Sequence, residues 1–444
     1  MGLIYKLAQI LEESRAEYLQ SKAEIYSEVA CFGHTQQDKR NLLAYGNNLQ
    51  WMNYLKDHLG MEGNLQLIYV DPPFYSKADY FMSVKIESEK LEEDFKIKQT
   101  VYTDTWNKGI EDYLKMIAVR LFVMRDLLSD EGCVWIHLDW HVAHYVKLLM
   151  DEIFGENNFV NEIIWTYKSG GTSNRRFSRK HDTLLFYSKT DRYYFNPQKE
   201  KSYNRGFKPY RFKGVTEYED EQGWYTMVNM KDVWQIDMVG RTSAERTGYA
   251  TQKPELLLSR ILESCTREGD LCADFFGGSG TLAAAASRMN RRWISCDIGL
   301  SSIANIQKRL LSNEMDFSFF IQDNECFENP DGEIEVKFQS CTDDMVASLE
   351  LTLLHYQPSE KWLEALTPKD KTLIEAILKE DSMSLIEFWS VDTQYNGKVH
   401  QPQEIIFKTK GCLERKVVIH DTAGVIHIIC VDVFGNRVAK TING

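Results

Sequence analysis

Long apolar runs are absent from this chain of 444 residues. No stretch approaches the roughly 18 consecutive apolar residues that a membrane-spanning helix needs. The first 29 residues contain five glutamates, which is unlike a signal or transit peptide. We therefore expect no membrane association and a cytoplasmic location.

Paired cysteines are absent as well. The nine cysteines are odd in number and include no Cys-x-x-Cys motif, which predicts reduced thiols and no structural zinc. His137, His141 and His144 straddle a predicted strand end and helix start with no carboxylate-rich cluster beside them, so we assign them capping or core roles. The sequence predicts no metal site.

An excess of positive charge is absent: 52 lysines and arginines are outnumbered by 65 acids, and the net charge of −13, taken alone, argues against a nucleic-acid partner. Residues 166–215 differ from the rest: they contain thirteen lysines and arginines against three acids, and aromatic residues are interleaved with them. This combination is typical of surfaces that follow phosphates and stack on bases. We predict that this basic segment contacts nucleic acid; a solvated loop is the alternative.

Residues 67–70 form a short apolar run that ends in Asp71-Pro72-Pro73-Phe74. The run suits a strand buried on both faces of a parallel sheet, and the prolines prevent its continuation because they donate no backbone hydrogen bond. Asp71 is therefore expected at the carboxyl end of a strand, which is the edge where open α/β sheets bind ligands.

Such a strand end suits a planar nitrogen heterocycle. Asp71 can accept a hydrogen bond from an exocyclic amino group, the rigid backbone can offer a carbonyl, and Phe74 can stack on the ring. The alternative is a strand followed by a plain proline turn, with Phe74 in the core.

A second strand end lies near residue 275. A predicted strand at 271–275 leads into a glycine-rich turn at 276–281 and an alanine-rich helix at 282–289, and the next strand ends at Asp297. Glycines let the backbone approach a ligand, and an acid at the next strand end can hold ribose hydroxyls. A P-loop is excluded because no Gly-Lys-Ser/Thr follows, and a nicotinamide dehydrogenase is disfavoured because Asp71 to Phe74 would have no role.

The remaining patterns predict an amphipathic helix at 1–29, helices at 49–59, 110–128, 141–154 and 255–266, and strands at 41–45, 133–138, 162–167 and 183–187, the last antiparallel. Residues 75–107 read as a long polar loop, and regular patterning fades over 189–249. Beyond residue 313 we expect helices at 343–379 and then strands at 385–391, 404–408, 416–420 and 425–433, forming a small antiparallel β module.

Several motifs in this order resemble the β-class amino-methyltransferases of DNA, most closely the modification (Mod) type of adenine-N6 enzyme. The resemblance covers roughly residues 40–310 and rests on six motifs: Gly46-Asn47-Asn48, Asp71-Pro72-Pro73-Phe74, Glu162-Ile163-Ile164-Trp165, His181-Asp182-Thr183-Leu184-Leu185-Phe186, Gln252-Lys253-Pro254 and Phe276-Gly277-Gly278-Ser279-Gly280-Thr281. The family often has Asp where this chain has Asn47, and Tyr where it has Phe74.

The resemblance implies a Rossmann-like S-adenosylmethionine-dependent methyltransferase fold: a mostly parallel sheet with an antiparallel strand, in permuted motif order. It divides the chain into an N-terminal helix (1–30), a catalytic half (31–190), a target-recognition region (191–249), a cofactor half (250–312) and a C-terminal α+β module (313–444).

The family's roles carry over to matching positions. The catalytic group would be Asp71, Pro72, Pro73 and Phe74. The residues that would bind S-adenosyl-L-methionine are Asn47, Lys253, Pro254, Asp274, Phe276, Gly278, Ser279, Gly280, Thr281 and Asp297. The residues that would bind DNA are Arg175, Arg176, Arg179, Lys180, Arg205, Lys208 and Arg211.

The implied activity is methyl transfer to the N6 amino group of adenine in double-stranded DNA, within a restriction-modification setting and with a restriction subunit or a second copy as possible partner. Cytosine-N4 methylation uses the same amino chemistry, and Asp rather than Ser at position 71 favours adenine. A cytosine-C5 enzyme would need a nucleophilic cysteine, and none lies near this motif. A catalytically silent DNA-binding subunit is the alternative from another class.

Overall fold

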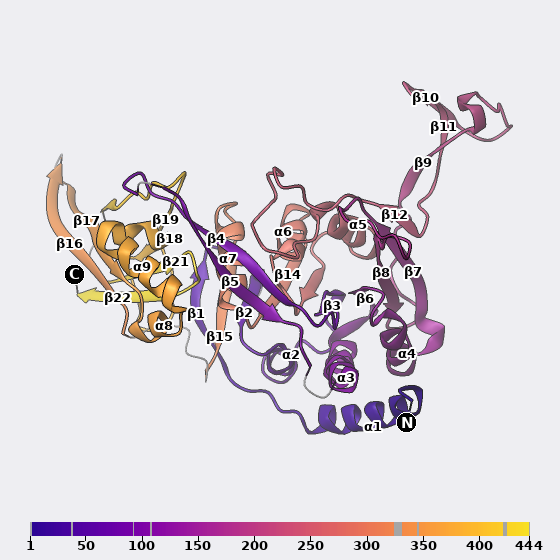
Figure 1. The fold of residues 1–444 in the computed structure, drawn as a ribbon, viewed down its shortest axis with the longest axis horizontal. Coiled ribbons are helices and arrows are strands. Elements are labelled where there is room, and N and C mark those ends of the chain that lie inside the picture. The colour runs from indigo at the N-terminus through magenta and orange to yellow at the C-terminus, as the bar shows by residue number, and fades with distance from the viewer. Residues whose placement is uncertain are drawn as a thin grey trace.

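The computed structural model describes residues 2–36, 39–91, 93–106, 109–323, 331–343, 346–420 and 424–443. Its centre is a ten-stranded sheet (Figure 1). The strands follow in the spatial order β1 (Tyr26–Phe32), β15 (Phe317–Gln322), β2 (Asn41–Tyr45), β14 (Arg292–Asp297), β13 (Leu271–Asp274), β3 (Leu65–Val70), β6 (Leu128–Leu138), β8 (His181–Ser188), β7 (Phe159–Thr166) and β12 (Val233–Gln235).

From β15 through β2, β14, β13 and β3 to β6, every two adjacent strands are parallel to each other. β1 runs antiparallel to β15 at one edge, and β8 runs antiparallel to both β6 and β7 near the other. The predicted fold class, a mostly parallel sheet with an antiparallel strand, is therefore confirmed, as is the antiparallel direction predicted for residues 183–187.

Helices cover both faces of this sheet. Four helices contribute to the hydrophobic cluster on one face: α1 (Ile4–Gln20), α2 (Asn48–Asp57), α3 (Ile110–Leu127) and α4 (Ala143–Phe154). Three cover the other face: α5 (Glu255–Cys265), α6 (Thr281–Arg288) and α7 (Leu300–Leu311). Short 3-10 turns lie at Glu156–Asn158, Arg205–Phe207 and Ser382–Leu385.

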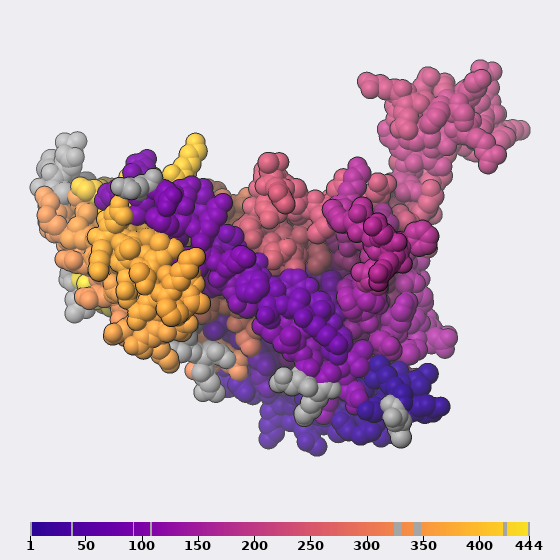
Figure 2. All heavy atoms as spheres, viewed as in Figure 1, coloured from indigo at the N-terminus to yellow at the C-terminus, as the bar shows by residue number. Residues whose placement is uncertain are grey.

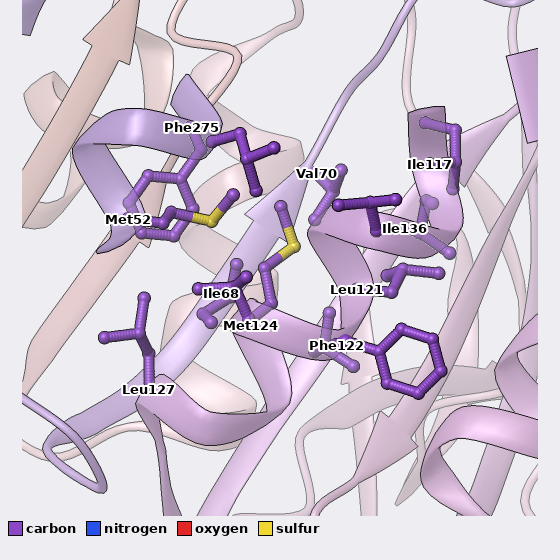
Figure 3. Packing of buried hydrophobic residues seen from close by; sticks show 14 of the residues in the cluster. Met52, Ile68, Val70, Ile117, Leu121, Phe122, Met124, Leu127, Ile136 and Phe275 are labelled. Atoms are coloured by element: carbon purple, nitrogen blue, oxygen red, sulfur yellow. The ribbon is translucent and has the colours of Figure 1, made fainter. Parts of the chain in front are cut away.

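The central strand β3 supplies side chains to both layers. Ile68 and Val70 pack with Met52 and Met124 on the α2 and α3 side, as Figure 3 shows, while the alternate residues of β3 join the cluster on the opposite face. All six residues of β3 are buried. A continuous apolar run, rather than alternating polarity, is what a strand enclosed on both faces requires.

The two predicted strand ends lie side by side, because β3 and β13 are adjacent and parallel. From β3 the chain passes through α3 to β6, and from β13 it passes through α6 to β14, which lies in the opposite direction. Such a reversal of strand order opens a crevice at the carboxyl ends of the two strands, where ligands bind in open α/β sheets.

Residues 75–107 were predicted as a loop, and this is wrong for most of the segment. They contain a two-stranded hairpin, β4 (Asp79–Ile86) and β5 (Phe95–Thr103), although Asn107 itself lies outside the described residues. The hairpin extends from the crevice to the C-terminal module (Figure 1), where Val84, Ile86 and Ile97 are buried in that module's core. The apolar residues that cover this hairpin come from a distant part of the chain. The local sequence pattern of residues 75–107 therefore did not indicate buried strands.

The termini of the methyltransferase-like region also differ from prediction. The expected helix at 1–29 ends at Gln20, and β1 begins at Tyr26. At the other end, β15 lies beyond residue 312, where we placed the end of the cofactor half, yet it pairs with β2 in the main sheet. β1 and β15 pair with each other, so each strand depends on a partner almost 300 residues away in sequence.

The C-terminal module contains two small antiparallel sheets. One consists of β16 (Glu333–Asp343), β17 (Val346–Gln357) and β20 (Lys416–Ile419); the other consists of β19 (Glu404–Phe407), β18 (Ile386–Asp392), β21 (Val425–Asp432) and β22 (Arg437–Asn443). The four predicted strands are confirmed. The helices expected over 343–379 are confirmed only in part. α8 (Glu360–Glu364) and α9 (Pro368–Asp381) form, but β17 occupies the first part of this range.

A three-stranded arm stands clear of the body (Figures 1 and 2). It consists of β9 (Lys199–Tyr203), β10 (Glu217–Asp220) and β11 (Gly223–Asn229), and it falls within the region where we expected little regular structure. Across the described residues, no helix combines the length and the apolar character needed to cross a membrane.

Truncating the central strand tests this packing. Ile68→Ala removes a fully buried side chain between the sheet and α3, and should lower the free energy of unfolding by about 2 to 5 kcal/mol. Ile4→Ala is the matched control, because Ile4 is 71% exposed on α1, and should change stability by no more than about 0.5 kcal/mol. Urea denaturation followed by circular dichroism measures both. Equal losses would show that β3 is not the packed centre of the domain.

Candidate active site

Both strand ends open into one cavity of about 310 Å³. Asp71, Pro72, Pro73 and Phe74 line it from the end of β3, and the glycine-rich turn lines it from the end of β13. The predicted cofactor residues among its lining are Asn47, Lys253, Asp274, Phe276, Gly278, Ser279, Thr281 and Asp297. Pro254 and Gly280 do not line it; they precede α5 and α6 as N-terminal cap residues.

The glycine-rich turn requires residues that have no Cβ atom. Gly278 and Gly280 adopt left-handed backbone conformations, with φ of 51° and 71°. A Cβ atom on Gly277 would lie 2.5 Å from the hydroxyl oxygen of Ser295, too close to be accommodated. The turn therefore brings its backbone against the neighbouring strand and against Ile306 in the middle of α7, where larger residues would not fit.

Two aspartates, the buried Asp274 and the partly buried Asp297, hold this turn in place. Asp274 accepts a hydrogen bond from the Phe276 N–H at 2.9 Å, and Asp297 accepts bonds from the N–H groups of Gly278 at 2.8 Å and Gly299 at 2.7 Å. Burial raises the pKa of Asp274 to about 8, and the nearby charges of Asp71 and Asp297 add to the shift. Burial also raises the pKa of Asp297, although its backbone hydrogen bonds oppose the change.

Lys253 links the two halves of the site. Its ammonium group bonds to Oδ2 of Asp71 and lies 5.3 Å from the centre of the Phe74 ring. The resemblance had placed Lys253 with the cofactor, so this contact with the predicted catalytic acid was not expected. The second carboxylate oxygen, Oδ1, is buried and accepts no hydrogen bond from the described part of the chain.

The hairpin forms a wall that sequence reasoning missed. Tyr80 and Tyr102 line the cavity from β4 and β5, and their rings stack with centroids 4.7 Å apart. Just beyond β5, Asp104 is fully buried and accepts hydrogen bonds from the N–H of Ser76 at 2.5 Å and its hydroxyl at 2.8 Å. Asp104 thereby braces the segment that follows Phe74. The unusual length of the 75–107 connection was the available signal.

Asn47 and its neighbour support the cavity from α2. The Asn47 side chain caps that helix by accepting the N–H of Leu49 at 2.9 Å. Asn48 donates to the carbonyl of Phe275 at 2.8 Å and accepts from Arg120 at 2.7 Å. Burial lowers the pKa of Arg120 to about 10. Arg120 lines the cavity but was not predicted, since nothing in the helical pattern of residues 110–128 distinguishes it.

Arg309 is a second residue that the sequence did not reveal. It is buried on α7, pairs with Glu255 at 2.5 Å, and donates to the carbonyl of Ser279 at 2.9 Å and the hydroxyl of Thr281 at 3.2 Å. Ser279 and Thr281 also bond to each other, at 2.9 Å. The two hydroxyls are therefore part of the framework that fixes the glycine-rich turn.

The predicted DNA-binding residues lie outside the cavity, on two surface segments. Arg175, Arg176 and Arg179 are exposed on the loop between β7 and β8, and Arg179 covers the ring of Trp140 at 3.4 Å. Lys180 instead holds this loop together, donating to the carbonyls of Ser169 and Gly170, both at 2.6 Å.

Arg205, Lys208 and Arg211 are exposed on the arm. Over residues 199–229 the six basic residues are nearly balanced by five acids, and some of these acids are engaged within the arm. Asp220 pairs with Lys201 at 2.6 Å, and Glu217 accepts the backbone N–H groups of Tyr210 and Arg211. The exposed positive charge of the arm is therefore concentrated in the connection between β9 and β10. Over the described residues, no group of three or more His, Cys, Asp or Glu side chains could hold a metal ion.

The raised pKa of Asp274 predicts a pH-dependent stability. Between its ordinary value of 3.8 and about 8, the folded protein retains a proton that the unfolded chain releases, so stability falls as pH rises through this window. Asp274→Asn keeps an acceptor for the Phe276 N–H but removes the charge. We expect the variant to match the parent near pH 4 and to exceed its unfolding free energy at pH 8, measured by urea denaturation. Asp57→Asn, at an exposed position, is the control; a deficit of Asp274→Asn at pH 8 would contradict the account.

The sequence is similar to a family of DNA methylases and to several known methyltransferases. The DNA methylase family N6_N4_Mtase matches residues 65–308. The type II methyltransferase M.EcaI of Enterobacter cloacae is 25% identical over 334 residues, spanning 61% of this chain and 71% of that protein. The type II methyltransferase M2.DpnII of Streptococcus pneumoniae is 26% identical over 278 residues, spanning 61% of this chain and 89% of that protein.

Two further similarities are more limited. The Mod subunit of the type III restriction-modification enzyme EcoP15I of Escherichia coli is 26% identical over 169 residues, spanning 35% of this chain and 26% of the subunit. Among solved structures, the cytosine-N4-specific PvuII DNA methyltransferase is 16% identical with a TM-score of 0.41, over 62% of this chain and 88% of that chain. Because the family match covers more than half of the sequence, the chain belongs to the N6_N4_Mtase family of DNA methylases, which take their methyl group from S-adenosyl-L-methionine.

Proposed function

We propose that this protein methylates the N6 amino group of adenine in double-stranded DNA. The observation that carries the proposal is the single cavity shared by Asp71 and Phe74 with the turn at 276–281. A methyl group can pass directly from donor to acceptor only if the two binding sites meet. The adjacency of β3 and β13 supports such a meeting.

The cofactor half of the cavity fits S-adenosylmethionine. The left-handed glycines open the turn to a ligand, Asp297 lines the cavity where ribose hydroxyls can reach it, and a volume of about 310 Å³ lies at the lower end of the range for small-molecule sites. The carboxyl groups of Asp71 and Asp297, which line the same cavity, can interact favourably with a positively charged ligand. When bound, the cofactor supplies a methyl group activated by a sulfonium sulfur.

The target half suits an amino group. The amino nitrogen of adenine is a weak nucleophile because its lone pair is conjugated with the ring. Oδ1 of Asp71, which is buried and accepts no hydrogen bond from the described residues, can accept one N–H, and the Pro72 carbonyl can accept the other. Held in this way, the nitrogen moves toward tetrahedral geometry and its lone pair becomes available. Lys253 keeps Asp71 in place through the other carboxylate oxygen.

The base must leave the duplex to reach this site, which costs a few kcal/mol. Phe74 can offset part of this cost by stacking on the extruded ring. The exposed basic residues of the arm and of the loop after β7 can bind the flanking phosphates. The arm projects from the body, where a bound duplex could contact it (Figure 2).

Cytosine-N4 methylation is the second candidate, since the same two acceptors can hold either amino group. The PvuII methyltransferase is named as cytosine-N4-specific. Asp at position 71 favours adenine. The similarity to a Mod subunit supports a role in restriction-modification, with a restriction subunit or a second copy of this chain as partner. The proposed location is the cytoplasm, where the DNA substrate is.

Removing the Asp71 carboxylate tests the catalytic assignment. Asp71→Ala should lower single-turnover methylation by at least about 100-fold, while the dissociation constant for S-adenosylmethionine changes little. Chromatography and mass spectrometry of nucleosides from treated DNA should detect N6-methyladenine with the wild-type protein. N4-methylcytosine would establish the second candidate, and normal methylation by Asp71→Ala would refute the role of this residue.

Charge removal on the arm tests the DNA contact. Arg205→Ala combined with Lys208→Ala should weaken DNA binding and reduce the slope of log affinity against log salt concentration by about two. Lys369→Ala with Lys379→Ala, on exposed positions of α9, is the control and should leave the slope unchanged. If both double variants bind DNA as the parent does, the arm does not carry phosphate contacts.

A further inference from the structure

The loop between β7 and β8 carries the most exposed large apolar side chain of the described residues. Residues 168–179 are all exposed, and Phe177 is 98% exposed. Between residues 168 and 180 the loop contains five lysines and arginines and no acid. Single exposed apolar residues are common on protein surfaces, but this one lies among charges of one sign. The proposed phosphate contacts account for these charges and give the ring no role.

The stem of this loop is fixed. Lys180, just before β8, donates to the carbonyl of Gly170 at 2.6 Å and so joins the two ends of the loop. The guanidinium of Arg179 lies 3.4 Å from the ring centre of Trp140, which follows β6. The exposed segment between these anchors includes Phe177, so the ring projects from a defined base.

The stem leaves the sheet at the same edge as the catalytic motif. β7 runs in the direction of β6, since both are antiparallel to β8, and β6 is parallel to β3. The carboxyl ends of β3, β6 and β7 therefore lie at one edge. The loop begins at this edge, and so does the motif at 71–74.

Side-chain contacts connect the stem to that motif. Tyr167, the first residue after β7, donates to Asp182 at 3.0 Å, and Asp182 is hydrogen-bonded to His137 at 3.2 Å. The ring of His137 lies against that of Phe74, with centroids 5.7 Å apart. Phe74 is the residue that we propose to stack on the extruded base. The stem is therefore held in a fixed relation to the place where the base would be bound.

The ring is close enough to reach DNA bound over the cavity. β8 is two strands from β3, so at about 4.8 Å per strand their ends at this edge are roughly 10 Å apart. Phe177 precedes β8 by four residues, which can span at most about 14 Å. Phe177 can therefore contact a duplex whose extruded base occupies the cavity.

A base that leaves the duplex opens a gap between its two neighbours in the stack. Proteins that deform DNA insert apolar side chains, Phe among them, between base steps. An aromatic ring in the gap can stack on the neighbouring bases and loses its contact with water. Arginines beside the inserted ring can bind the adjacent phosphates, which stabilises the insertion.

We propose that Phe177 enters the duplex at the position that the extruded base vacates, with Arg175 and Arg176 on the adjacent phosphates. The inference rests on the proposed function, because a base leaves the stack only if the cavity receives it. It gives the loop a second role beside phosphate binding, which is to keep the target base out of the duplex.

Binding to DNA that already contains a gap tests the insertion without any methylation. Fluorescence anisotropy measures the dissociation constants for a short duplex and for the same duplex with a central abasic site. The wild type should bind the abasic duplex about tenfold more tightly, since the ring then enters without displacing a base. Phe177→Ala should reduce this preference to no more than about twofold. An unchanged preference in the variant, or none in the wild type, would overturn the inference.

Two further variants separate stacking from charge. Arg175→Ala combined with Arg176→Ala should weaken binding to both duplexes alike and reduce the salt slope by about two, with the preference unchanged. Loss of the preference in this pair would show that charge distinguishes the duplexes, which contradicts insertion of the ring. Tyr5→Ala is the matched aromatic control, because Tyr5 is 76% exposed on α1, and it should bind both duplexes as the wild type does.

Methyl transfer at the site that the wild type methylates provides the second measurement. Phe177→Ala should lower the single-turnover rate by roughly 10- to 100-fold on a paired target, and removal of the base opposite the target should restore most of it, because less is then lost on extrusion. A deficit that persists would place Phe177 in the cavity instead of the stack and would refute the proposal. If the wild type methylates no DNA, the proposed function fails, and the binding experiment still decides whether the ring enters DNA.

Discussion

The parallel pairing of β3 with β13 is the constraint on which the site depends. Paired strands lie about 4.8 Å apart, so two chain segments separated by some 200 residues must end next to each other. Asp71 follows one strand and Asp274 ends the other. The connections after them lead to strands on opposite sides, and the crevice between β3 and β13 is therefore lined by residues 71–74 from one strand end and by the glycine-rich turn from the other.

Burial of acidic groups gives this crevice its electrostatic character. Asp71, Asp274 and Asp297 line one cavity, and the charges of Asp71 and Asp297 both help to raise the pKa of Asp274. Lys253 compensates part of this charge by pairing with Asp71. A cationic methyl donor bound in this cavity would compensate more of it.

Local patterns were sufficient to predict the strand ends but not their surroundings. Asp71 and Asp297 were identified because each ends an apolar run, and the turn at 276–281 because its glycines lie between a strand and a helix. The contact of Lys253 with Asp71 and that of Arg309 with the turn join residues distant in sequence, and spacing carries no information about them. The β4–β5 hairpin was taken for a loop because its buried residues contact a module some 250 residues later. That contact, with the hydrogen bond from Gln99 to the carbonyl of Phe434 at 3.1 Å, ties one wall of the cavity to the C-terminal module.

The claim that two half-sites meet in one cavity can be measured with a single compound. A bisubstrate analogue has two halves, a target adenosine and the cofactor. The N6 nitrogen of the target adenosine is linked to the cofactor's amino-acid side chain at the position of the sulfonium. Isothermal titration should show that it binds at least about 100-fold more tightly than either half alone, since the second half binds without a further loss of translational freedom. Binding no tighter than that of the cofactor half would contradict the account, because the two sites could not then be occupied by one connected molecule.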